Sequence, residues 1–386
     1  MSSWPLNVLV GLALWSATGS YAQSVVRRDS GAVRVIEIAG ANLAALPTWR
    51  LEGPKVRIEP EMGGLEYELN NAGSPWRLTD GRIVLANNQV ELRFFDSTGR
   101  YLGTVARRGR GPGEYQQLLR LVRVQGDTLL ALDARGSRID VRDPNGKFVR
   151  AFKIPRTFKF AGLGSPAAVF EEYRYPDLRR LGLQQDTAVV RQLYTDGTAG
   201  HVVARLPGSW SEVLPLRSDI VWRGLMLAGE SMLAGGNGSA VYVQGDEFTT
   251  YWFGYGGRLV AITRVLLPRV PVTAADRRDE ERRQARLLAN HRVRVNPGVP
   301  PPVYATYLPQ ATRVLVDSEG RAWLRRRARY GAPEAEWIVL APFGAPIARI
   351  TMPAALQPND IGVDYVLGIL PDDDGVQSVY SYAIVR

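Results

Sequence analysis

Residues 107–115 form the stretch whose composition is best suited to binding chemistry. Arg107, Arg108 and Arg110 are interspersed with glycines and followed by Glu114. Guanidinium groups bind carboxylates and phosphates through paired hydrogen bonds, and glycine backbone can cradle an anion. The stretch could therefore hold an anionic ligand. The alternative is structural: glycines permit a tight connection between two sheet units, and Glu114 pairs with a nearby arginine. The stretch has neither the P-loop sequence nor a dinucleotide-binding fingerprint.

Aromatic residues are densest in the run 250–257, and a further tryptophan lies upstream. Trp222, Tyr251, Trp252 and Tyr255 could stack on sugars or on apolar ligands, because glycines beside the run leave the rings accessible. If the run is a strand, however, alternate side chains point in opposite directions, and half of these rings belong to the core. We treat the four residues as candidate ligand-binding residues.

Few residues are suited to catalysis or metal binding. The chain has no cysteine and only two histidines, His201 and His291. This composition excludes disulfides, a thiol nucleophile, cysteine zinc ligands and a lipoprotein anchor. The run Asp372–Gly375 could offer oxygens to Ca²⁺, but it lacks the ligand spacing of a calcium loop and is also a normal solvated turn. We assign no catalytic residue and no metal ligand, and the cofactor is unknown, with calcium the one metal considered.

The net charge of +10 favours anionic partners, and two arginine-rich stretches could form a basic surface. A solvated face is the simpler interpretation of both. No nucleic-acid-binding signature accompanies the charge, so no nucleic-acid partner is expected. The stretches comprise Arg277, Arg278, Arg282, Arg283 and Arg286, and then Arg321, Arg325, Arg326, Arg327 and Arg329.

These candidates must be positioned by strands, because residues 79–154 contain a repeated β pattern. Alternating apolar and polar residues are interrupted by turn sequences such as Asp96-Ser97-Thr98-Gly99 and Asp143-Pro144-Asn145-Gly146. Gly99 and Gly146 are 47 residues apart, within the period of about 40–50 residues that is typical of propeller blades. Four short antiparallel strands per unit cannot bury both faces alone, so several units must stack around an axis.

The motifs in this region resemble those of a known family. Phe95-Asp96-x-x-Gly99, a strand and then Gly-x-Gly-Pro-Gly-Glu-aromatic at 109–115 are similar to the secreted bacterial six-bladed β-propellers related to NHL-repeat and TolB-like propellers. The resemblance returns at 311–386 and is weak at 156–300. It implies an all-β, six-bladed β-propeller of four-stranded antiparallel blades, with Gly-Pro-Gly-Glu as a structural connector. The family shares a fold and not one reaction.

We expect one propeller domain over residues 23–386, with a surface insertion at 273–302. Strands before the first blade should complete a blade at the C-terminal end, where residues 376–385 form the last strand. In the insertion, Thr273 and Asp276 resemble a capping box, and the helix that follows has an Asp279–Arg283 pair and ends at a proline-rich run. This helix is expected to cover one propeller face near Tyr251–Tyr255.

Two functions are compatible with these features. The first is an exported binding or scaffold protein, periplasmic or secreted and monomeric, that presents one face to a peptide, a glycan or an envelope protein. The second is a metal-dependent propeller hydrolase or lyase, lactonase-like or similar to NHL-type lyases, acting at the central channel. Three or four Asp, Glu, Asn or His side chains converging in the channel would favour the enzyme, whereas small or apolar groups would favour binding.

Residues 1–22 predict an export signal. They contain no charged side chain, and Ser20 and Ala22 are small residues at the −3 and −1 positions of a cleavage site before Gln23. The apolar run is shorter than a transmembrane helix needs, so no transmembrane segment should remain after removal of the signal. Mass spectrometry of the mature protein should find an N-terminus at or within a few residues of Gln23. An intact N-terminus on a cytosolic protein would contradict export.

Overall fold

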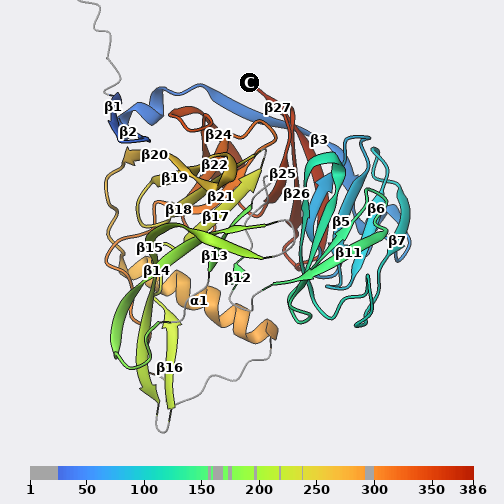
Figure 1. The fold of residues 1–386 in the computed structure, drawn as a ribbon, viewed down its shortest axis with the longest axis horizontal. Coiled ribbons are helices and arrows are strands. Elements are labelled where there is room, and N and C mark those ends of the chain that lie inside the picture. The colour runs from blue at the N-terminus through green and yellow to red at the C-terminus, as the bar shows by residue number, and fades with distance from the viewer. Residues whose placement is uncertain are drawn as a thin grey trace, which may run out of the picture.

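The structure, a computed structural model, describes residues 25–154, 158–159, 168–172, 176–194, 198–216, 219–236, 238–291 and 300–386. Figure 1 shows twisted antiparallel sheets arranged around a centre, with one α-helix, α1, on the outside. The described strands, β1 to β27, form five sheets. No described helix is long and apolar enough to cross a membrane. The expected all-β propeller is confirmed.

Two four-stranded sheets correspond to the repeat at 79–154. Their turns are built as the sequence predicts: the Asp143 carboxylate accepts the N–H groups of Asn145 and Lys147 at 2.9 and 2.8 Å, and Gly146 has φ of 78°. The first sheet contains β4 (Gly73–Arg77), β5 (Ile83–Asn87), β6 (Glu91–Phe95) and β7 (Tyr101–Val105), and the second contains β8 (Leu118–Arg123), β9 (Leu129–Asp133), β10 (Arg138–Arg142) and β11 (Phe148–Lys153).

The third sheet has a long extension. β14 and β15 continue beyond the other strands, and β16 pairs with the end of β15, so that this part projects from the body of the molecule beside α1 (Figure 1). Arg223 on β16 fixes the chain nearby, donating to the carbonyl groups of Pro300 and Pro301 at 2.8 and 2.6 Å. The sheet consists of β12 (Phe158–Lys159), β13 (Ala168–Glu172), β14 (Gly182–Leu193), β15 (Ala199–Leu216) and β16 (Asp219–Gly224).

The remaining two sheets include the N-terminal strands. In the six-stranded sheet, β2 pairs in parallel with the outer strand β20 and β1 pairs with β2. The members are β1 (Val25–Ser30), β2 (Val33–Ala39), β17 (Ser231–Gly236), β18 (Ser239–Gln244), β19 (Thr249–Phe253) and β20 (Leu259–Leu266).

The eight-stranded sheet joins two four-stranded units through β3 (Thr48–Ile58). β3 pairs antiparallel with β27 from Ile58↔Val379 to Arg50↔Val385, as expected for a strand that completes a C-terminal unit, and its first residues pair in parallel with β24. The other members are β21 (Ala311–Val316), β22 (Ala322–Arg326), β23 (Glu334–Leu340), β24 (Pro346–Pro353), β25 (Gln357–Ile361), β26 (Tyr365–Pro371) and β27 (Gln377–Val385).

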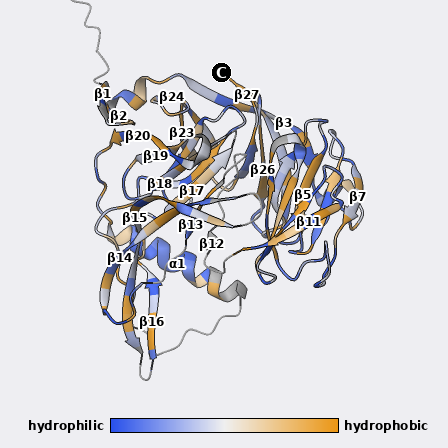
Figure 2. Cartoon of the chain, in the orientation of Figure 1, coloured by the Kyte–Doolittle hydropathy of each residue, from blue (hydrophilic) through white to orange (hydrophobic). Residues whose placement is uncertain are grey.

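The core lies between successive sheets. Hydrophobic residues are frequent along the strands, and hydrophilic residues are frequent in the loops (Figure 2). Val84 and Leu92 of one sheet pack with Leu121 and Leu129 of the next. β5 and β18 are buried along their whole length, because both of their faces are covered by neighbouring sheets. Short 3-10 helices connect strands at η1 (Gly40–Ala45), η2 (Pro60–Met62), η3 (Gln125–Asp127) and η4 (Tyr255–Gly257).

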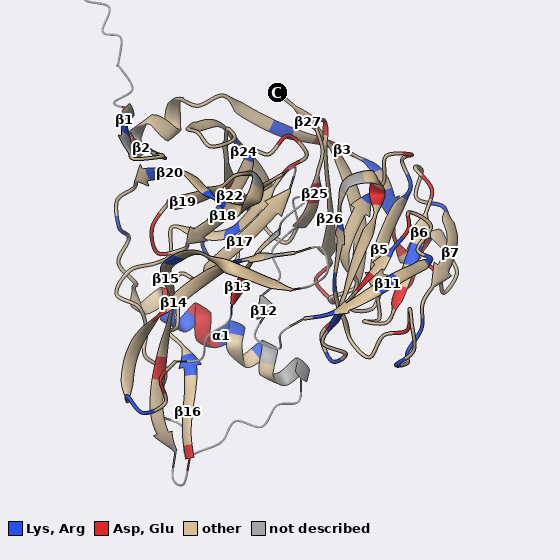
Figure 3. Cartoon of the chain, viewed as in Figure 1, with Lys and Arg blue, Asp and Glu red and all other residues tan. Residues whose placement is uncertain are grey.

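Helix α1 (Ala274–His291) is the expected insertion, and its capping box is present. Thr273 Oγ1 donates to the Asp276 carboxylate and accepts the Asp276 N–H at 3.2 Å. Acidic and basic residues adjoin one another along the helix (Figure 3). The predicted Asp279–Arg283 pair is wrong: Asp279 accepts from Arg282, and Arg283 donates to Glu280 at 2.8 Å. Glu280 is buried and so requires the guanidinium partner.

The expected position of the helix over the aromatic run is also wrong. η4, which contains Tyr255, is the turn between β19 and β20, whereas α1 follows the opposite end of β20. The helix instead lies against Tyr304, whose hydroxyl donates to Glu281 at 3.1 Å and whose ring is contacted by Arg277.

Two Asp-x-x-Gly turns, at 96–99 and 372–375, allow the packing against β3 to be tested. Gly99 and Gly375 both have positive φ, 94° and 85°, in Asp-x-x-Gly turns, but a Cβ on Gly99 would lie 2.3 Å from the Arg57 carbonyl oxygen of β3, whereas one on Gly375 would meet nothing within 4 Å. Gly375→Ala should cost about 1 kcal/mol from backbone strain, and Gly99→Ala about 1–3 kcal/mol more from the clash. Urea unfolding measures both; equal losses would contradict the close packing of this turn on β3.

Candidate functional site

A cavity of about 620 Å³ lies where all five sheets meet, and we call it the central channel. Its wall is made largely by the first strands of the sheets, which run side by side around it. Residues from β8, β17 and β21 contribute most, and Trp76, Glu171 and Asn359 come from β4, β13 and β25.

Two arginines occupy the same position in two of these strands. Arg120 is the third residue of β8 and Arg313 the third residue of β21, and both line the channel. Because β8 and β21 belong to sheets that are not neighbours in the strand order, the two guanidinium groups reach the cavity from different sides. Arg120 is exposed to the channel, and Arg313 is half-buried.

Arg313 is a positive charge held away from bulk water. Its Nη2 donates to the Pro358 carbonyl at 2.8 Å. Among the described residues, no carboxylate lies within 4.0 Å of its guanidinium. Burial, together with the like charges of Arg120 and Arg325, lowers the pKa of Arg313 to about 10, so the group stays protonated at neutral pH. Arg120 is open to the channel, but desolvation by the surrounding wall lowers its pKa as well. An anion bound in the channel would offset the cost of desolvating the arginines and reduce the repulsion between them.

Arg325 extends this basic group. It pairs across the β-ladder with Arg313, donates to the Ala354 carbonyl at 2.8 Å, and has its own pKa lowered by burial. The channel is not uniformly basic, because Glu171 and Glu230 also line it. Glu171 is buried and accepts the Ser231 hydroxyl at 2.8 Å. The channel therefore combines two arginines with polar groups and aliphatic side chains.

The glycine-rich stretch at 107–115 connects β7 to β8. Glu114 is bonded within the stretch: it accepts from Arg107 Nε at 2.9 Å and from the Gly111 N–H at 3.0 Å, and these bonds hold the pKa of its carboxyl below the usual value. Arg107, Arg108 and Arg110 have exposed side chains. The geometry agrees with the connector interpretation for Glu114, and ligand binding by the three arginines stays a prediction.

Two arginines that the sequence did not single out hold this connection in place. Arg142 is buried on β10 and donates to the Gly113 carbonyl and to the Tyr115 hydroxyl, both at 2.6 Å, and to Gly146. Arg138 donates to the Arg110 and Gly111 carbonyls at 3.1 and 3.0 Å. The available signal was the polar face of the strand 138–142, whose arginines alternate with apolar residues.

The four candidate aromatic residues do not form one surface. Trp252 is fully buried and cannot stack on a ligand, because alternation along β19 directs it into the core. Tyr251 is half-buried and packs against Tyr242, with ring centroids 6.0 Å apart. Trp222 is partly exposed on β16, in a different sheet. Tyr255 begins η4, and its side chain is not among those described.

The acidic turn at 372–375 is organised by its own backbone. Asp372 accepts the N–H groups of Asp374 and Val376 at 3.0 and 2.8 Å, as in the other Asp-x-x-Gly turns. In the described part of the chain, no three His, Asp or Glu side chains lie close enough together to hold a metal ion.

The sheets and the channel define an all-β propeller protein. Neither a scan against protein-family models nor a search of curated proteins found a match. The search of solved structures did find similar folds. A protein of Bacteroides fragilis that is proposed to be exported aligns over 91% of this chain and 99% of its own, with 11% identity and a TM-score of 0.50.

Two further solved structures are similar at lower scores. A member of the DUF4221 family from Bacteroides vulgatus covers 88% of this chain and 96% of its own, with 8% identity and a TM-score of 0.49. A gluconolactonase of Xanthomonas campestris covers 82% and 87%, with 8% identity and a TM-score of 0.41. At these identities the likeness shows the fold alone, and membership of the NHL-repeat or TolB-like families stays a prediction.

The contacts of the glycine-rich connection predict which arginines matter for stability. Arg142→Met should lower the free energy of unfolding by about 3 kcal/mol, because it leaves buried carbonyl and hydroxyl groups without their donor. Arg108→Met, on the exposed side of the same connection, should change it by less than about 0.5 kcal/mol. Chemical denaturation of both variants measures the difference. Similar losses would mean that the exposed arginine also supports the fold.

Proposed function

We propose that the protein is an exported six-bladed propeller that binds a carboxylate- or phosphate-bearing ligand in its central channel. The observation that carries the proposal is the pair Arg120 and Arg313, which reach one cavity from separate sheets while no described carboxylate neutralises Arg313. Burying a guanidinium costs free energy unless a partner offsets it. A channel lined by two guanidinium groups, one of them without a carboxylate partner among the described residues, is suited to an anion.

The blade count belongs to this proposal. We take the four-stranded units as six blades, counting two in the eight-stranded sheet, where β3 completes the unit of β25 to β27. Export is supported by the predicted signal at residues 1–22 and fits either a periplasmic or a secreted protein. The expected monomer and the peptide, glycan or envelope-protein ligand classes are compatible with an anionic group.

A binding function is preferred to the hydrolase or lyase alternative because of the side chains that line the channel. Metal-dependent chemistry there needs converging oxygen or nitrogen ligands. The described wall does offer Glu171, Glu230 and Asn359, but Glu171 is bonded to Ser231 and Asn359 to the Pro75 carbonyl. Among the described residues no three acids or histidines lie close enough together to hold a metal ion. Guanidinium groups bind and orient anions and do not coordinate metals. The enzyme remains the alternative that metal analysis of the purified protein, followed by a lactone-hydrolysis assay, would favour if positive.

The test is titration calorimetry with two anions, citrate for carboxylates and pyrophosphate for phosphates, at low ionic strength. Arg313→Gln should weaken binding of the preferred anion roughly tenfold or more, since a charge-assisted contact contributes about 1.5–3 kcal/mol. Arg120→Gln should act in the same direction. Arg135→Gln is the matched control, because Arg135 is exposed on the turn between β9 and β10.

The results distinguish specific binding in the channel from a general effect of net charge. Loss of affinity in both channel variants, with the control unchanged, supports the channel as the binding site. Equal weakening in all three variants would indicate a general effect of net charge. That result, or binding that does not depend on Arg313, would overturn the proposal.

A further inference from the structure

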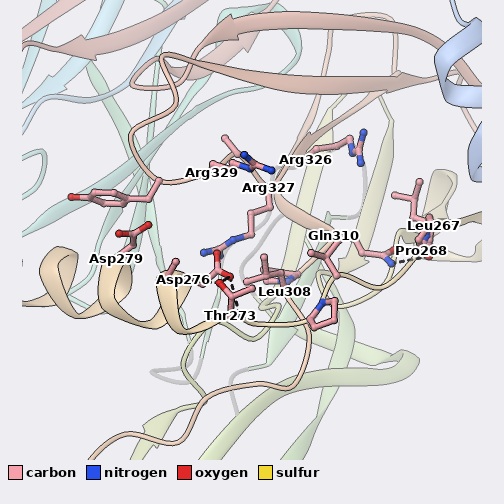
Figure 4. A pocket seen from close by; sticks show the side chains of 16 residues that line it. Leu267, Pro268, Thr273, Asp276, Asp279, Leu308, Gln310, Arg326, Arg327 and Arg329 are labelled. Atoms are coloured by element: carbon pink, nitrogen blue, oxygen red, sulfur yellow. Dashed lines mark hydrogen bonds between the residues drawn. The ribbon is translucent and has the colours of Figure 1, made fainter.

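A second cavity, of about 580 Å³, lies between α1 and the loop that joins β22 to β23, and we call it the helix pocket. Figure 4 shows side chains of the helix on one side and Arg327 and Arg329 of the loop on the other. The residues that lead into α1 and the segment near Leu308 close the remaining sides. A cavity of this size is typical of a small-molecule site. None of its lining residues lines the central channel.

One wall of the helix pocket is apolar. Leu267, Pro268, Val270, Leu308 and Pro309 line it, and their backbone is fixed by bonds such as Leu308 N–H to the Val270 carbonyl at 2.8 Å. Val270 is 55% exposed and Tyr330, at the rim, is 43% exposed. Apolar surface that stays open to water within a concave site can be covered by the body of a ligand.

Charged residues line the rest of the pocket, on the helix and on the facing loop, and most of these charges already have partners. The Asp276 carboxylate is bonded to Thr273, and the Asp279 carboxylate accepts from Arg282. Arg326 donates to Glu336 at 2.7 Å. The acids of the helix wall are therefore occupied by the cap and by helix neighbours.

Arg327 and Arg329 differ from these residues. Arg327 is half-buried and Arg329 exposed, and both line the pocket. Asp276 and Glu280 are near enough to favour the charged form of Arg327, but burial is the larger effect and its pKa is lowered. Within the described chain, neither guanidinium has a carboxylate within 4.0 Å. Two guanidinium groups without a close carboxylate partner among the described residues thus line the same cavity as the apolar side chains.

We propose that the helix pocket binds an amphipathic carboxylate, such as a medium-chain carboxylic acid, with its carboxylate on Arg327 and Arg329 and its apolar body against Val270 and Leu308. Arginine suits this role because its planar fork binds carboxylates in a bidentate manner. The site is distinct from the channel site of the proposed function, so each can fail without the other.

The test uses 8-anilinonaphthalene-1-sulfonate, a fluorescent probe with an apolar body and one anionic group, and decanoate as its competitor. Decanoate should displace the probe, whereas decan-1-ol, which has the same chain length and no charge, should be at least roughly tenfold weaker. Arg327→Gln should weaken probe and decanoate binding by about tenfold. Arg258→Gln is the matched control, because Arg258 is exposed at the opposite end of β20.

A second variant tests the same site in case Arg327→Gln destabilises the packing of α1. Val270→Glu places a carboxylate on the exposed apolar wall, where it should repel the anionic group without disturbing the core, and it should also weaken binding about tenfold. Circular dichroism confirms that each variant is folded. Equal displacement by decanol and decanoate, or undiminished binding in both pocket variants, would overturn the proposal.

Discussion

The structure depends on the requirement that every four-stranded sheet be covered on both faces. A single sheet of this size buries too little apolar surface to be stable alone. Here Val241 and Trp252 of the six-stranded sheet share a cluster with Leu324 and Ile338 of the next. The same requirement links the last unit to the first, because Val379 of β27 packs in one cluster with Ile83. The inner strands therefore carry apolar side chains on both faces, because a neighbouring sheet covers each face.

Arginine performs three distinct tasks within this arrangement. On β10, Arg138 and Arg142 bind the carbonyl groups of a glycine-rich connection, which has no side chains with which to pack. Between sheets, Arg123 lies 3.6 Å from the fully buried Asp360, whose pKa burial raises. In the channel, Arg313 donates to one carbonyl group among the described residues and has like charges nearby. The five donors of a guanidinium suit the first two tasks, and the third leaves donors for a ligand.

Local chemistry explains why parts of the fold could be predicted from the sequence. Turns such as Asp143–Gly146 are specified by their own side chains, and the capping box at Thr273 needs only residues three apart. The extent of β14 and β15 could not be predicted, because Pro207 and Gly208 interrupt the alternation. The two long strands form by pairing with each other, and β16 pairs only with the end of β15.

The central channel forms only when all the sheets are assembled, so no single segment of the sequence predicts it. Arg120 lies in Leu-Leu-Arg-Leu and Arg313 in Ala-Thr-Arg-Val, sequences without a shared motif. They reach the same cavity because each is the third residue of a strand that lines the channel. The position of α1 was mispredicted for a similar reason, since nearness in sequence to Tyr251 says nothing about which end of β20 the chain leaves.

The pairing of β3 with β27 has a consequence for the order of events during synthesis. The Tyr380 hydroxyl reaches Glu59 at 2.8 Å across 321 residues of sequence, so this junction cannot form until nearly the whole described chain has left the ribosome. Until then β3 keeps an unpaired edge, and unpaired edges recruit foreign strands. Contacts of such long range also slow folding. The nascent chain is thus exposed to misassembly at one defined seam, and the final strand is what ends that exposure.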